Sequence, residues 1–130
     1  CVYAVIKCES SFKSDAVSYV GARGLMQIMP DTFDWIKGRL KDTIEYDGMF
    51  TPEDNIRYGC HLYGYLMKKY ESEELAVAAY HAGMGNVDKW LSDKEYSSDG
   101  KTLDNIPFPS TKKYVTKVIE TKKIYQKLYK

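Results

Sequence analysis

Glu9 is the residue of this chain whose type and position most strongly suggest chemistry. Val2, Val5 and Ile6 precede it at the spacing of one helical face. Phe12 follows three residues later. A glutamate is almost never fully buried unless it is paired or used. Apolar surroundings favour the protonated carboxyl that a general acid needs near neutral pH. Periodicity alone leaves a structural role open, such as capping a helix or pairing with a lysine.

Three further side chains are candidates for binding. Gln27 interrupts the apolar run from Leu25 to Met29, and its amide needs hydrogen-bond partners that an apolar core does not offer. Tyr80 lies on an alanine-rich stretch and could face a ligand. Met29 fits core packing and a binding surface equally well.

The sequence lacks the usual patterns of a metal centre. His61 and His81 are not spaced as a metal-binding pair, and no HExxH or CxxC run is present. We therefore expect neither a metal nor a cofactor. Cys1, Cys8 and Cys60 are interpreted as buried, free thiols. Cys1 and Cys8 would lie about 10.5 Å apart along a helix axis, too far for a disulfide.

The elements that must position these residues are predicted to be helices, so the fold class is mainly α. Pro30 and Pro52 suit first helical turns, Ser72 suits an N-cap and Gly83 a helix end. No segment shows the sustained alternation of a β-strand. We expect helices over residues 2–12, from 30 to about 40, from 52 to about 70, from 73 to about 82, from 86 to 91, and from 110 or 111 onwards.

Length and composition are those of one soluble domain over residues 1–130. The chain is 44% hydrophobic and 28% charged, with a formal net charge of +1. This charge argues against a nucleic-acid partner. No stretch is apolar enough to span a bilayer, so we expect no stable membrane insertion of this segment. The first residues already have the pattern of a helix interior, and we expect the native start to lie upstream.

Three motifs in a fixed order resemble those of the soluble lytic transglycosylase family. Together they extend over nearly the whole chain, which makes the resemblance more specific than any single run. The first motif comprises Cys8–Phe12, Ala16–Ser18 and Gly21–Pro30, the second Ala79–Gly83 and Gly85–Val87, and the third Ile106–Phe108 with Tyr114 and Val115.

This resemblance implies a mostly helical, lysozyme-like fold with a glycan-binding cleft. It also implies cleavage of the β-1,4 bond between N-acetylmuramic acid and N-acetylglucosamine in peptidoglycan. Glu9 would be the catalytic acid/base. Peptidoglycan glycan strands would be the partner, and the location would be extracytoplasmic: cell wall, periplasm or secreted. We expect a monomer. The substrate-binding residues implied are Ser18, Gln27, Met29, Tyr80, His81 and Tyr114.

The carboxylates near Glu9 bear on the mechanism. Most glycosidases use two carboxyl groups roughly 5–9.5 Å apart. Asp15 and Asp31 are candidates for a second acid, but neither is paired with Glu9 by a motif. With a single acid, the substrate itself can supply the nucleophile. Attack by its own 6-hydroxyl would give a 1,6-anhydro-muramic product without water.

The sequence departs from the family pattern at three positions, of which His81 and Ser110 keep a weakly active wall-binding module open, and a hydrolase also remains an alternative. His81 stands where the family usually has asparagine, and Ser110 where it often has glutamate. Cys8 replaces a common polar residue beside Glu9. The alternatives are a lysozyme-type muramidase, which hydrolyses the same bond, and a wall-binding module with weak activity.

Overall fold

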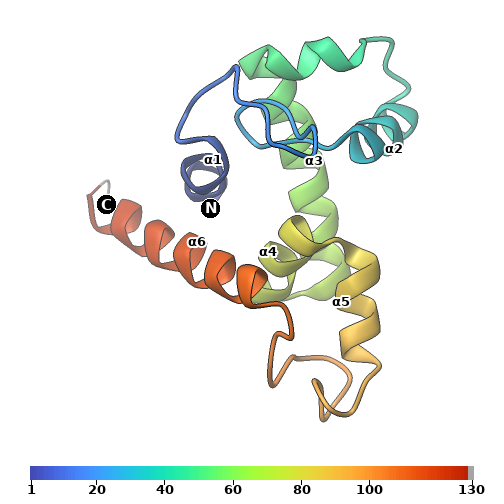
Figure 1. Cartoon of the computed structure of the whole chain (residues 1–130), viewed down its shortest axis with the longest axis vertical. Coiled ribbons are helices and arrows are strands. Elements are labelled where there is room, and N and C mark those ends of the chain that lie inside the picture. The colour runs from blue at the N-terminus through green and yellow to red at the C-terminus, as the bar shows by residue number, and fades with distance from the viewer. Residues whose placement is uncertain (129–130) are drawn as a thin grey trace. The chain divides into compact units, whose positions relative to one another are not determined.

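The computed structural model describes residues 1–128 and is mainly α, which confirms the predicted fold class (Figure 1). Within these residues there is no strand, only isolated bridges that join Arg23 to Val17 and to Ile28. The elements are α1 (Val2–Ser10), α2 (Pro30–Leu40), the 3₁₀ helix η1 (Tyr46–Phe50), α3 (Pro52–Tyr70), α4 (Glu73–Ala82), α5 (Met84–Leu91) and α6 (Pro109–Leu128).

The end of α1 differs from the prediction. The helix stops at Ser10 because Ser11 and Phe12 both adopt left-handed backbone angles, with φ of 51° and 64°. Phe12 therefore leaves the helical stripe, and 48% of its surface is exposed. Glu9 thus lies in the last turn of α1 rather than in its interior.

Other helix boundaries shift by one or two residues. Gly83, at φ 94°, ends α4 and also precedes α5, which therefore begins at Met84 rather than at residue 86. The last helix starts at Pro109, one residue before the earliest predicted start, because proline suits the first helical position. Residues 46–50, which lie between two predicted helices, form the 3₁₀ helix η1.

The chain divides into two compact units, Cys1–Leu62 and Tyr63–Lys130. In the first unit, Phe33 of α2 packs with its ring centroid 5.3 Å from that of Tyr46 and 5.2 Å from that of Tyr58. The buried apolar side chains that form the core of the unit include Met26, Ile28, Ile36 and Met49.

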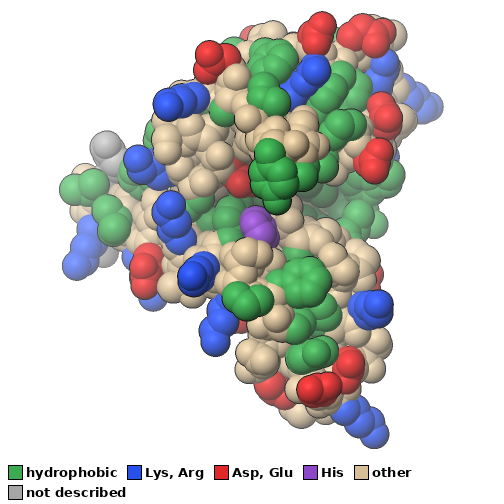
Figure 2. Space-filling view, viewed as in Figure 1, with side chains coloured by type: hydrophobic (Ala, Val, Ile, Leu, Met, Phe, Trp, Pro, Cys, Tyr) green, Lys and Arg blue, Asp and Glu red, His purple; other side chains and the backbone are tan. Residues whose placement is uncertain are grey.

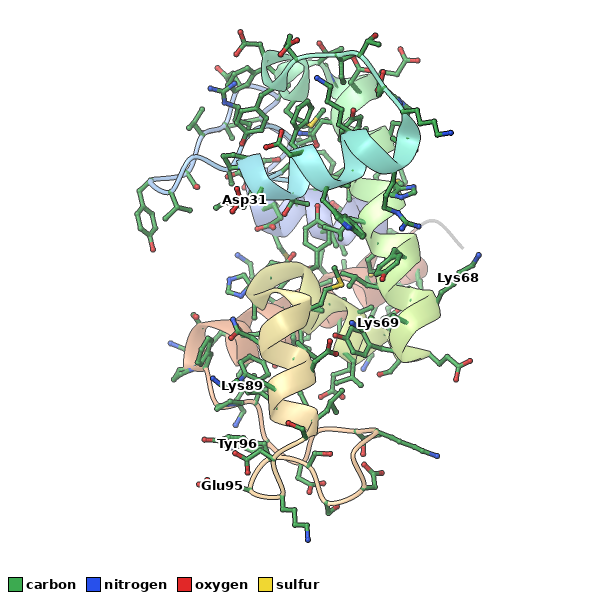
Figure 3. The ribbon with its side chains drawn as sticks, turned by 90° about the vertical axis from the view of Figure 1, so that its right-hand side faces the viewer. Asp31, Lys68, Lys69, Lys89, Glu95 and Tyr96 are labelled. Carbon is green, nitrogen blue, oxygen red and sulfur yellow. The ribbon has the colours of Figure 1, made fainter. Side chains whose placement is uncertain are left out.

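In the second unit, α4 is the central helix and packs against both α5 and α6. Its residues from Leu75 to Ala79 are all buried, and three of them are alanines. The end of α3 is tied to α5: Lys69 Nζ and Tyr70 Oη each lie 2.7 Å from a carboxylate oxygen of Asp88. Figure 3 shows Lys69 at the end of α3 and, below α5, the loop that bears Tyr96.

None of the helices in residues 1–128 is both long enough and apolar enough to cross a membrane.

The three cysteines form no disulfide, as predicted. Their predicted burial is wrong, because Cys60 is exposed and Cys1 and Cys8 are half-buried.

Candidate functional site

Glu9 is half-buried in the last turn of α1. Ala4, Val5 and Ile6 of the same helix are buried, so the apolar face predicted beside Glu9 is present. The following residue, Ser10, is also buried, and its Oγ donates a hydrogen bond to Ile6 O at 3.2 Å. This bond stabilises the last turn of α1, which is the turn that bears the Glu9 carboxyl.

Ser18 lies in the loop between α1 and α2, residues 11–28, which we call the Ser18 loop and which backbone hydrogen bonds fold onto itself. The Ser18 backbone N donates to Ala22 O, and Gly21 N donates to Ser18 O, both at 3.0 Å. Its side-chain Oγ accepts from Ala22 N at 3.0 Å and from Val20 N at 3.3 Å. Because Oγ only accepts in these contacts, the hydroxyl hydrogen can still be donated to a ligand.

Gln27 is half-buried in the same loop and adopts a left-handed φ of 52°. Its Nε2 donates to Gly24 O at 2.9 Å and to Ala16 O at 3.1 Å. These two bonds satisfy both amide hydrogens. Within the described residues no hydrogen bond reaches Oε1, so this oxygen can accept one from a ligand. Gln27 therefore has a structural role as well as the predicted binding role.

Met29 follows this loop and is the N-cap residue of α2. Its side chain is 38% exposed, whereas its neighbour Ile28 is buried. Core filling, one of the two interpretations open for Met29, is therefore excluded as its main role.

The sequence prediction missed Asn55, which holds this loop in place. Asn55 of α3 is fully buried. Its Oδ1 accepts from Met26 N at 2.8 Å, and its Nδ2 donates to Met49 O at 2.8 Å and to Arg23 O at 2.9 Å. A β-carbon at Gly24 would collide with Met49 O and the Asn55 amide, so only glycine fits there. A polar amide on the apolar face of a helix was the available signal.

Tyr46 is a second anchor that the prediction missed. Its Oη lies 2.6 Å from Ile28 O and 2.7 Å from Gly21 O, so its single hydrogen can be donated to either carbonyl of the Ser18 loop. Burial raises the pKa of Tyr46, which keeps this hydroxyl protonated as a donor. The Arg23 guanidinium stacks 4.1 Å from the Tyr46 ring centroid and pairs with Asp47 at 2.8 Å.

In the second unit, His81 and Tyr114 are brought together, although they are 33 positions apart in the sequence. Their rings stack with centroids 4.5 Å apart and an interplanar angle of 25°. His81 Nδ1 lies 3.0 Å from Oγ1 of Thr111, which is buried and was not predicted. His81 is exposed as a whole residue, but the partial desolvation of its ring lowers the pKa of His81, so its neutral form is favoured. Tyr80, beside it on α4, is half-buried.

The predicted site residues thus fall into two groups. Glu9, Ser18, Gln27 and Met29 belong to the unit of residues 1–62. The second group belongs to the unit that begins at Tyr63: Tyr80, His81 and Tyr114. Each group is built around a hydrogen-bonded scaffold of its own.

Comparison with known proteins identifies the family to which the chain belongs. A family model described as the transglycosylase SLT domain matches residues 1–103. The chain is 34% identical over 121 residues to a soluble lytic murein transglycosylase of Salmonella typhimurium, and the match covers 89% of the chain and 19% of that protein.

Solved structures show the same relationship. A lytic transglycosylase Slt of Pseudomonas aeruginosa, an inactive Glu-to-Gln mutant, superposes with a TM-score of 0.81 at 34% identity over 98% of the chain. The 70-kDa soluble lytic transglycosylase of Escherichia coli gives 0.78 at 28% identity over 91%. These matches cover 21% and 20% of the two larger chains, so this chain spans about a fifth of their length. The family model and the 34% identical relative together show that the chain belongs to the SLT-domain family of lytic transglycosylases.

Proposed function

We propose that this chain is the catalytic domain of an extracytoplasmic murein transglycosylase. It cleaves the β-1,4 bond between N-acetylmuramic acid and N-acetylglucosamine and leaves a 1,6-anhydro-muramic end. The observation that carries the proposal is the half-buried carboxyl of Glu9 in the last turn of α1, in a chain of this family. In a relative with 34% identity, the inactive mutant is a replacement of glutamate by glutamine.

The position of Glu9 suits a general acid. The carbonyl groups at the C-terminal end of a helix carry partial negative charge, which disfavours a carboxylate nearby. The apolar residues of α1 act in the same direction, because they limit the solvation of a charge. Both effects favour the protonated carboxyl that must donate a proton to the leaving oxygen.

The hydrogen-bonding groups of the Ser18 loop suit a sugar. The Ser18 hydroxyl can donate and Gln27 Oε1 can accept, and both belong to a loop that Asn55 and Tyr46 hold rigidly. Fixed donors and acceptors bind a polar ligand at little entropic cost. In the second unit, the ring of His81 stacked on Tyr114 offers a further polar edge.

The chemistry balances without water. Protonated Glu9 gives its proton to the glycosidic oxygen as the bond from that oxygen to C1 of the muramic residue breaks. The acetamido group of the substrate supports the positive charge that develops at C1. The 6-hydroxyl oxygen then bonds to C1, and its proton returns to Glu9. An intramolecular attack of this kind has a large advantage over water, provided that the sugar is held in the reactive geometry.

Mass spectrometry of fragments released from purified peptidoglycan tests the proposal. The expected fragments end in 1,6-anhydro-N-acetylmuramic acid. They lack a reducing end and are lighter than hydrolysis products by one water, about 18 Da. Ordinary reducing ends as the main product would favour the lysozyme-type muramidase. No turnover, with binding retained, would favour the wall-binding module.

A further inference from the structure

Helix α6 has two faces of different character. Thr111, Tyr114, Val115 and Val118 are buried and form its inner face. The opposite side carries exposed lysines, which we call the lysine stripe: Lys112, Lys113, Lys117, Lys123 and Lys127. Figure 2, in which Lys and Arg are blue, shows several blue side chains along the course of α6, whose basic residues are all lysines.

The charges of the lysine stripe are not neutralised by the fold. Within residues 1–128, none of its ammonium groups forms an ion pair, and Glu120 is the one acidic residue on that side of the helix. Lys122, which is half-buried, pairs instead with Glu73 at 2.5 Å. Since the whole chain has a net charge of only +1, the stripe is a local concentration of positive charge.

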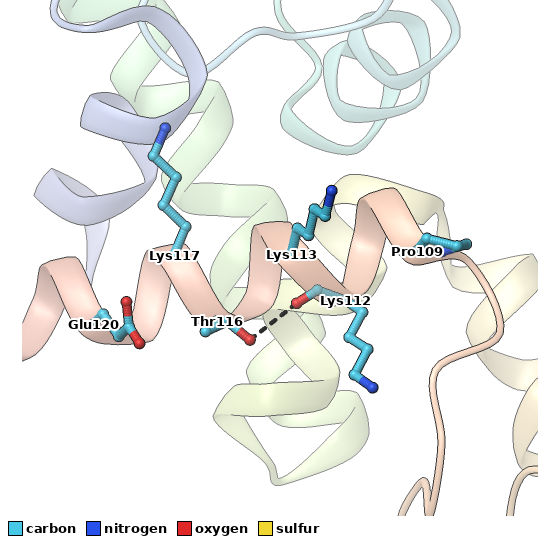
Figure 4. A pocket seen from close by; sticks show the side chains of 6 residues that line it. All are labelled: Pro109, Lys112, Lys113, Thr116, Lys117 and Glu120. Atoms are coloured by element: carbon cyan, nitrogen blue, oxygen red, sulfur yellow. Dashed lines mark hydrogen bonds between the residues drawn. The ribbon is translucent and has the colours of Figure 1, made fainter.

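The form of this surface suits an extended anion. An open hollow of about 450 Å³ runs along the start of the stripe, lined by Pro109, Lys112, Lys113, Thr116, Lys117 and Glu120 (Figure 4). It is too large and open to enclose a single carboxylate. Lysines are flexible point charges rather than rigid forks. From Lys112 to Lys127 the stripe extends over about 22 Å, so it matches repeated charges along a polymer.

We propose that the lysine stripe binds the carboxylates of the peptide stems of peptidoglycan; this rests on the proposed function, which brings that polymer to the chain. The stems carry free carboxylates at intervals along the glycan, and these complement the stripe in charge and in spacing. A membrane surface is a poorer match, because the exposed large apolar side chains of α6, Ile124 and Leu128, lie near its end. The hollow at the start of the stripe is lined by lysine, threonine, proline and glutamate instead. Nucleic acid fits less well too, since α6 has no arginine.

Co-sedimentation with insoluble purified peptidoglycan tests this surface. All proteins carry Glu9→Gln, so that turnover does not dissolve the polymer. One variant combines Lys112→Glu, Lys113→Glu and Lys117→Glu. Its matched control combines Lys13→Glu, Lys94→Glu and Lys101→Glu, which are exposed and lie outside α6, and it changes the net charge equally. We expect binding to weaken at least about tenfold in the stripe variant and less than about twofold in the control.

Chemical modification of the peptidoglycan tests whether its stem carboxylates are the anionic groups that the lysine stripe binds. Amidation of the stem carboxylates should reduce binding of the parent protein to the level of the stripe variant. Retained binding after amidation would overturn the proposal. So would a loss that follows only the acid extraction of phosphate polymers, or equally tight binding to vesicles of anionic lipid. Equal weakening of the stripe variant and its control would show that only net charge matters, and it would also overturn the proposal.

Folding and catalysis are tested separately. Circular dichroism and thermal unfolding establish that each variant folds, and Lys113→Gln with Lys117→Gln gives a second variant that removes charge without reversing it. In the background with Glu9 intact, the stripe variant should cleave a peptide-free glycan as the parent does, but native peptidoglycan more slowly. Failure of all turnover would count against the proposed function alone. Unchanged sedimentation of the stripe variant would count against the lysine stripe alone.

Discussion

The carboxyl group of Glu9 has to exist in two protonation states within one proposed turnover. Glu9→Gln keeps the shape of the side chain but can neither donate nor accept the proton. We expect release of soluble fragments from peptidoglycan to fall by at least about a hundredfold, with an unchanged circular dichroism spectrum. Glu95→Gln is the control, because Glu95 is exposed in a loop and lies in no motif. Activity near that of the parent in Glu9→Gln would exclude Glu9 as the acid/base.

His81 links protonation to stability in the second unit. Its pKa is lowered in the folded chain by burial, against about 6.5 when unfolded. Between these two values the unfolded chain binds more protons than the folded chain. The free energy of unfolding therefore decreases as the pH falls below about 6.5, and this decrease ends below the folded-state pKa.

Replacement of His81 by asparagine should remove this step. Asn can still form a hydrogen bond with Thr111 Oγ1, which now lies 3.0 Å from His81 Nδ1, but it does not titrate. Urea unfolding from pH 7.5 to pH 5 measures the effect, and His61→Asn is the control that should retain the step. An identical pH dependence in His81→Asn and the parent would contradict the assignment.

The residues of the proposed site could be read from motifs, but their scaffolding could not. Glu9, Ser18 and Gln27 lie within one short stretch of sequence, so their types and spacing were visible. The hydrogen bond of Thr111 to His81 joins residues from different helices. Such pairs depend on how the helices pack against each other, and a local sequence pattern does not predict that packing.

At the scale of elements, the Ser18 loop is held by Asn55 of α3. Asn55→Ala would remove three hydrogen bonds in a buried region, those to Met26 N, Met49 O and Arg23 O. We expect this change to lower the free energy of unfolding by about 3 kcal/mol, at about 1 kcal/mol for each lost hydrogen bond. Asn86→Ala is a matched control, because Asn86 is exposed and makes one bond to Ala82 O. Chemical denaturation measures both, and equal effects would contradict the role of Asn55.

Helix types and approximate positions followed from sequence, whereas several boundaries did not. Pro52, Ser72 and Gly83 have strong local preferences, and the helices begin or end at these residues as predicted. The end of α1 depends on left-handed angles at Ser11 and Phe12, and neither residue favours that conformation by itself. Local propensity therefore missed the turn that brings Glu9 to the end of its helix.

At the scale of the whole molecule, a carboxylate with a lowered pKa makes the free energy of unfolding depend on pH. Hydrogen bonding to Arg57 lowers the pKa of Asp42 to about 2, from 3.8. Arg57 Nη2 lies 2.6 Å and Tyr58 Oη 3.0 Å from Asp42 Oδ2. The stabilisation is present above the unfolded value and is lost as the pH falls through about 2.

Asp42→Asn should therefore be less stable than the parent at pH 7. The difference should shrink as the pH falls from about 4 to about 2, where the parent loses the same charge. Thermal unfolding across this range measures it. Asp34→Asn, an exposed change on α2, is the control. A difference between Asp42→Asn and the parent that does not vary with pH would show that packing, not charge, is responsible.

The lysines near the start of α6 have a consequence for the energetics of the fold itself. Positive charge is unfavourable near the amino end of a helix, and the first turn of α6 contains no acidic residue to offset Lys112 and Lys113. An anion bound at the lysine stripe would relieve this repulsion. By linkage it would raise the melting temperature of the folded chain, whose helix α6 carries Thr111 and Tyr114. Reversing these charges should have a similar effect with no anion present. The free chain would then be less stable than the wall-bound chain. Its free energy of unfolding would be highest where it is bound to its proposed substrate.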